Sequence, residues 1–91
     1  MAQIYKTNGE VVDVKPQKGK KFNLEEMQAI VGGYIEIYHV NNDKDLLIIN
    51  EEGKLLGLHY NEKATELFRK AYRTDDFIVG DALVCDNSMV D

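Results

Sequence analysis

The sequence has one cysteine, Cys85, and no apolar run long enough to cross a bilayer. A single cysteine excludes an intrachain disulfide, and with it the small secreted domains that disulfides stabilise. A membrane-spanning helix needs about 18 consecutive apolar residues, which no stretch of this chain approaches. The residues after Met1 also lack the pattern of a secretory signal. We therefore expect a cytoplasmic location and no membrane contact.

Positive charge is also scarce, with 11 lysines and arginines against 16 acidic residues and a net charge of −5. A general nucleic-acid binder needs clustered cations that displace the counterions of the phosphates. The deficit therefore argues against direct nucleic-acid binding. It leaves open an acidic protein that imitates nucleic acid and blocks a host enzyme.

Motifs for metal binding and catalysis are missing as well. The only imidazole or thiol groups are His39, His59 and Cys85, and no two of them have the short spacing typical of a zinc site. Cys85 lies in an apolar stretch, where a buried, inert thiol is the common state. The pair Gly32-Gly33 precedes a strand rather than a helix, so it is no phosphate loop. We expect no enzyme activity, no cofactor and no metal.

What the sequence does contain is the pattern of one small folded domain. Its apolar content of 44% and charged content of 30% are typical of a folded domain. A chain of this length buries only about 60–65% of the surface that its unfolded form exposes, and oligomerisation often adds the missing burial. We predict a single domain over residues 1–91, with a polar, frayed tail at 86–91.

The first third of the chain predicts a hairpin and a short helix. The strands Ala2–Tyr5 and Val11–Val14 flank an Asn-Gly turn, which is the strongest short hairpin signal. Asn23 and Glu26 form a capping-box pattern at the start of the helix. Gly32 ends this helix, because glycine accepts the left-handed conformation without a Cβ clash.

The middle of the chain predicts three strands. In Tyr34–Val40, Ile35 and Ile37 point one way, and Tyr34, Glu36 and Tyr38 point the other way. The unbroken apolar run Leu46–Ile49 predicts a central strand covered on both faces, by helices on one side and by a partner subunit on the other. A charged turn then predicts a hairpin into a further strand, Leu55–Leu58.

The last third predicts a second helix capped by Asn61, with an apolar stripe at helical spacing, and a final strand, Phe77–Cys85. The whole pattern predicts an α+β fold. We expect a mainly antiparallel sheet of five to six strands with two helices packed on one face.

Two surfaces are candidates for binding. Exposed tyrosines beside acids can anchor a protein partner, which makes Tyr34, Glu36 and Tyr38 a candidate interaction surface, or ordinary cross-strand pairs. A strand that leads into a helix N-terminus can hold a small anion such as a nucleotide. The candidate residues for that ligand are Lys54, His59 and Asn61, and the plain alternative is an N-cap beside a solvated histidine.

Four stretches of the chain, taken in order, carry a family resemblance. They are Leu24–Gln28, Val31–Glu36, Asn50–Leu58 with Asn61, and Ile78–Gly80. They resemble the small bacterial and phage domain catalogued as domain of unknown function 3846, over about residues 22–85. The family has no assigned activity, so the resemblance carries over no catalytic or binding residues. It implies a cytoplasmic accessory role in a phage, plasmid or conjugative element.

We therefore expect a non-enzymatic accessory protein that acts by binding another protein, as a homo-oligomer, through Tyr34, Glu36 and Tyr38. The alternatives are a binder of a small anionic ligand and the acidic mimic of nucleic acid. Under this resemblance, we expect the lysine-rich loop 15–21 and the short C-terminus to differ from those of many relatives of the family.

Overall fold

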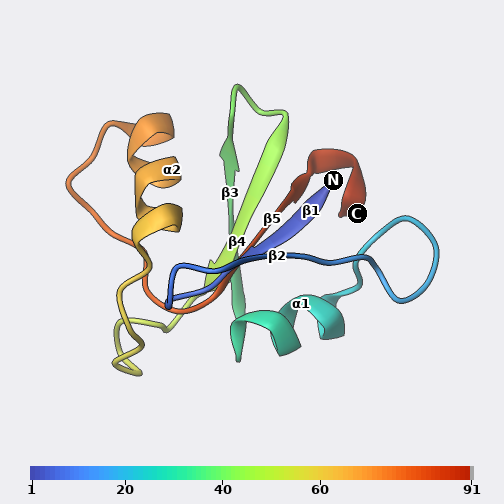
Figure 1. Cartoon of the computed structure of the whole chain (residues 1–91), viewed down its shortest axis with the longest axis horizontal. Coiled ribbons are helices and arrows are strands. Elements are labelled where there is room, and N and C mark those ends of the chain that lie inside the picture. The colour runs from blue at the N-terminus through green and yellow to red at the C-terminus, as the bar shows by residue number, and fades with distance from the viewer. Residues whose placement is uncertain (91) are drawn as a thin grey trace.

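A computed structural model describes residues 1–90. It has a five-stranded antiparallel sheet in the order β2-β1-β5-β4-β3, with two α-helices and one short 3-10 helix (Figure 1). The strands are β1 (Ala2–Tyr5), β2 (Val11–Asp13), β3 (Ile35–Val40), β4 (Asp45–Asn50) and β5 (Ala82–Asp86). The helices are α1 (Leu24–Val31), α2 (Glu62–Tyr72) and the short 3-10 helix η1 (Asn87–Met89). The predicted α+β class and antiparallel sheet are confirmed.

Local signals account for the N-terminal half. The Asn-Gly turn joins β1 to β2 in the expected antiparallel hairpin, with Tyr5 opposite Val11. Helix α1 has Asn23 as its N-cap, and both hydrogen bonds of the capping box with Glu26 are formed. Gly32 follows the helix with φ 82°, which is the left-handed conformation expected there.

The two helices cover opposite faces of the sheet, so the prediction that both pack on one face is wrong (Figure 1). Side chains alternate along β4: Leu46 and Ile48 join the cluster under α1, whereas Leu47 and Ile49 join the cluster under α2. A central strand with two covered faces is as expected. A partner subunit is not needed to cover the second face, because α1 and α2 each cover one.

The predicted hairpin after β4 is also wrong, because residues 51–57 form consecutive turns rather than a strand. The buried Asn50 side chain starts this loop: it donates to the Val31 carbonyl at 3.1 Å and accepts from the Glu52 N–H at 2.8 Å. The turns leave Leu55 and Leu56 86% and 59% exposed. The sheet therefore has five strands, the lower number of the five to six that we expected.

The C-terminal segment differs from its prediction in two ways. Strand β5 begins at Ala82 rather than Phe77, because residues 77–81 cross from α2 to the sheet in an irregular path. The expected frayed tail at 86–91 is packed through residue 90: η1 follows β5, and the Met89 carbonyl accepts from the Phe22 N–H at 2.8 Å. Asp91, the last residue of that tail, lies outside the described residues.

Within residues 1–90, no helix has the length and apolar content that crossing a membrane requires.

Candidate binding cleft at the outer edge of the sheet

Strand β3 lies at one edge of the sheet and pairs only with β4. In an antiparallel ladder, residues alternate between bonding to the neighbouring strand and pointing their peptide groups away from it. The Glu51 N–H donates to the Tyr34 carbonyl at 2.8 Å, so the even-numbered residues of β3 bond to β4. The peptide groups of Ile35, Ile37 and His39 therefore point away from the sheet.

One of these outward peptide groups already has a partner. The His39 N–H donates to the Tyr72 hydroxyl of α2 at 3.1 Å. Among the described residues, no hydrogen bond is recorded for the outward N–H and carbonyl groups of Ile35 and Ile37, and the Ile37 side chain is 39% exposed. The edge of β3 thus has a blocked end at His39 and an open stretch from Ile35 to Ile37.

A small cleft of about 160 Å³ lies beside this open stretch. Glu36 and Tyr38 of β3 form one wall. The loop 51–57 and the segment after α2 form the others, and they contribute polar and apolar side chains in turn: Glu51, Lys54, Leu55, Asp76 and Phe77. The cleft is large enough for one side chain rather than for a cofactor.

Lys54 and Asp76 line the cleft and form an ion pair that joins the loop 51–57 to the segment after α2. The Lys54 ammonium also lies 4.4 Å from the centre of the Phe77 ring, which adds a cation–π contact. The hydrogen bond from Lys54 and a second one from the Phe77 N–H hold the pKa of the Asp76 carboxyl below its usual range. Both side chains are about half exposed, with 49% relative accessibility each, so the pair fixes the two loops together more than it stabilises the fold.

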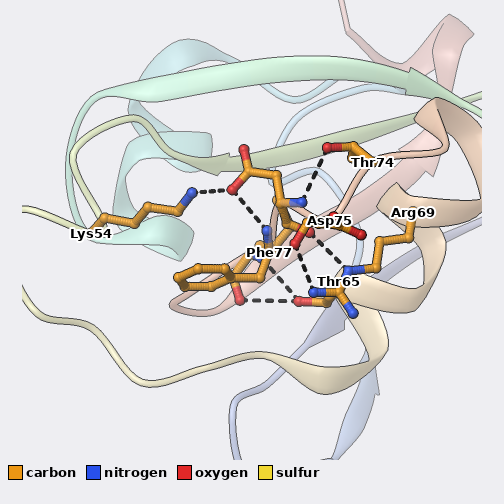
Figure 2. Close-up of polar contacts among 8 residues, drawn as sticks. Lys54, Thr65, Arg69, Thr74, Asp75 and Phe77 are labelled. Carbon is orange, nitrogen blue, oxygen red and sulfur yellow. Dashed lines mark hydrogen bonds and ion pairs between the residues drawn. The ribbon is translucent and has the colours of Figure 1, made fainter.

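Helix α2 holds the segment that carries Asp76 (Figure 2). Arg69 donates to the carbonyls of Asp75 and Asp76, both at 2.9 Å. Thr65 is buried in α2, and its hydroxyl accepts from the Ile78 N–H at 2.9 Å. Figure 2 shows Lys54 reaching this segment from one side and Arg69 and Thr65 from the other. These contacts make the far wall of the cleft a fixed surface.

Tyr38 belongs to the cleft and to the core at once. Its ring packs edge-on against Phe68 and Tyr72 of α2, with ring centres 4.8 and 5.6 Å apart. Burial raises the pKa of the Tyr38 phenol, and the charge of Glu36 with the hydrogen bond that Glu36 accepts raises it further. Tyr38 is therefore a neutral hydroxyl that keeps the Glu36 carboxylate beside the cleft.

The structure divides the predicted interaction surface. Glu36 and Tyr38 line the cleft, as neighbours on one wall. Tyr34 precedes β3, is 65% exposed, and lines a neighbouring hollow with Gly33 and Leu56. Two of the three residues thus share a site, and the third lies next to it.

The structure does not bring the predicted ligand residues together. Lys54 lines the cleft and is paired with Asp76, whereas His59 lines a different hollow near Gly80. Asn61 is fully buried, and its amide is occupied by the carbonyls of Tyr5 and Gly80. These three residues therefore do not form one site at which a small anion could bind.

Sequence reasoning missed Asp76, Phe77 and Leu55 as residues of the cleft. The Asp75-Asp76 pair interrupts the helical pattern just before the aromatic residue Phe77. This pattern is a signal for a loop that carries functional residues. Leu55 was assigned to a strand because apolar runs favour strands. Only the turns of residues 51–57 place it at the surface.

Cys85 is a structural thiol, and it gives a testable pH dependence. Burial, aided by the charges of Asp45 and Asp86, raises the pKa of the Cys85 thiol to about 11. Between about pH 8.5, where an unfolded cysteine ionises, and about pH 11, only the unfolded chain loses this proton. The thiol should therefore make the free energy of unfolding fall as the pH rises through this range. A Cys85→Ala variant followed by urea denaturation at pH 8 and 10 should show a smaller fall than the parent, and an equal fall would contradict this assignment.

Among residues 1–90, no three histidine, cysteine or acidic side chains gather in a way that could hold a metal ion. A family model described as domain of unknown function (DUF3846) matches residues 4–89, a wider range than the 22–85 that carries the resemblance. No curated protein and no solved structure matches the chain.

Proposed function

We propose that this chain, which belongs to the family described as domain of unknown function (DUF3846), is a non-enzymatic domain. In this proposal, the domain binds another protein along β3. The observation that carries the proposal is the open edge of β3. The peptide groups of Ile35 and Ile37 point away from the sheet with no recorded partner in the described part of the chain.

The cleft beside the edge supports the proposal. In strand addition, an extended peptide extends the sheet, its main chain supplies hydrogen bonds, and pockets for alternate side chains supply specificity. The edge offers main-chain bonding at Ile35 and Ile37, and the cleft is lined by the flanking residues Glu36 and Tyr38. An exposed edge strand otherwise invites aggregation, so natural proteins cover such edges or use them.

A partner other than a second copy fits this geometry better than the homo-oligomer that we expected. The expectation depended on the apolar run Leu46–Ile49, whose two faces α1 and α2 cover. The accessory role in a phage, plasmid or conjugative element, which the family likeness implies, is compatible with such a binding domain and stays a prediction.

Proline substitution tests the proposal. Ile37→Pro removes an outward N–H and places a ring in the path of an added strand, but it costs the β3–β4 ladder no hydrogen bond. We expect peptides selected on the parent domain from a random 12-residue display library to bind this variant at least about tenfold more weakly. Fluorescence anisotropy with labelled peptides measures the affinity.

The opposite edge of the sheet supplies a matched control. Val11 of β2 is 38% exposed, and its N–H also points outward, because Glu10 accepts from Lys6 and Val14 donates to Ala2 on either side of it. Val11→Pro should bind the selected peptides as the parent does. Equal binding by all three proteins, or no peptide enrichment at all on the folded parent, would contradict the proposed function.

A further inference from the structure

We infer that the segment bound by β3 is an extended peptide of another protein that places a lysine or arginine opposite Glu36. The inference rests on the proposed function, since it needs an added strand. It follows from the register of the open peptide groups, from the charges around them, and from the residues that a second copy of this chain would bring.

The register follows from the hydrogen-bonding groups. An antiparallel strand that bonds to the open groups of both Ile35 and Ile37 must place one residue directly opposite Glu36. That position is a non-hydrogen-bonded pair, in which the two side chains approach most closely. The side chain opposite Glu36 lies on the same face of the sheet as Glu36, which is the face of the cleft.

The charges around this position are acidic. Glu36, Glu51 and Asp76 line the cleft with a single cation, Lys54. The charge of Lys54 is taken by Asp76, which leaves the two glutamates without a cation. In the described part of the chain, no ion pair is recorded for Glu36. A basic side chain opposite Glu36 would supply the missing charge, whereas an acidic one would be repelled.

A second copy of this chain does not meet these requirements. A symmetric pair of β3 strands that uses the four open groups of Ile35 and Ile37 puts Glu36 opposite Glu36 of the other copy, and like charges directly opposite destabilise a sheet. Shifting the centre to Ile37 pairs Ile35 with His39 of the other copy. That register needs the His39 N–H, which the Tyr72 hydroxyl occupies.

The test compares two selections from the same random 12-residue display library. Peptides selected on the parent domain should share one lysine or arginine within an alternating apolar pattern, and those selected on Glu36→Lys should share an acidic residue at that position. For one parent-selected peptide, Glu36→Lys should weaken binding by about tenfold, because an attraction becomes a repulsion of similar size. Changing the basic residue of the peptide to glutamate should restore most of the loss.

Each other result has a definite meaning. Peptides that need the open edge, as Ile37→Pro shows, but that have no basic preference would overturn this inference and leave the proposed function standing. A failure of Ile37→Pro to weaken any selected peptide would overturn both. A dimer of the parent in sedimentation experiments that Ile37→Pro abolishes would also overturn the inference, because the occupant would then be a second copy.

Discussion

Replacing Asn61 with alanine should lower the free energy of unfolding by about 3 kcal/mol. The Asn61 side chain is fully buried and makes three bonds at once: it donates to the carbonyls of Tyr5 and Gly80 and accepts from the Ala64 N–H at 3.1 Å. Alanine would remove the N-cap of α2, worth about 1 kcal/mol. It would also remove the donor to the Gly80 carbonyl, and a buried carbonyl left without a partner costs about 1–3 kcal/mol.

The N-cap of the other α-helix is a matched control. Asn23 caps α1 with a capping box, but it is exposed and its side chain joins no distant segment. Asn23→Ala should therefore cost only about 1 kcal/mol. In a domain of this size, the Asn61 variant should melt about 12–24 °C below the parent, against about 4–8 °C for the Asn23 variant. Equal losses in urea denaturation would show that Asn61 acts only as a cap.

Leu47→Ala and Ile48→Ala should each lower the free energy of unfolding by about 2–5 kcal/mol. The two residues are neighbours on β4 and point to opposite faces, yet both are 0% exposed. Leu47 packs under α2 and Ile48 packs under α1. Each truncation leaves a cavity in a different core cluster. Because both side chains are fully buried and similar in volume, the two losses of unfolding free energy should be of similar size.

This pair tests the arrangement of the helices. If both helices covered one face, one of the two truncations would fall on a solvent-facing side chain and cost little. Leu55→Ala, at a leucine that is 86% exposed, is the control and should change the unfolding free energy by less than about 0.5 kcal/mol. A loss of more than about 1 kcal/mol at Leu55 would contradict its exposed position on the loop 51–57.

Elements whose signals lie within a few residues were predicted well. The Asn-Gly hairpin, the capping box at Asn23 and the cap at Asn61 each depend on hydrogen bonds inside a short stretch of chain. The apolar stripe of α2 and the alternation of β3 are equally local. Such patterns are visible in the sequence because the residues that interact are close along the chain.

The errors have one cause in common. The stretch Leu55–Leu58 has the composition of a strand, but the turns of residues 51–57 follow from the buried Asn50, whose amide bonds to Val31 of a distant helix. The apolar stripe of a helix likewise does not predict which side of the sheet that helix covers. A stripe indicates that a face is buried and does not indicate against what.

The candidate site shows the same division. Glu36 and Tyr38 were identified from the alternation of one strand, and both line the cleft. Asp76 and Phe77 were missed, because they reach Lys54 only after α2 has been placed and Arg69 has fixed the segment behind it. The order of the strands places β3 at an edge of the sheet, and no pattern within the sequence of β3 predicts that position.

The sequence by itself determined the α+β class, the helix caps, the N-terminal hairpin and the alternation of β3 that places Glu36 and Tyr38 on one face. The tertiary structure alone decided that the helices lie on opposite faces, that β3 is an edge, and that Glu36 meets Lys54 and Asp76 across a cleft. The physical reason is the range of the interactions. Caps, turns and alternation are set by neighbours in the chain, whereas edges and clefts arise when segments far apart in the sequence compete to bury the same apolar faces.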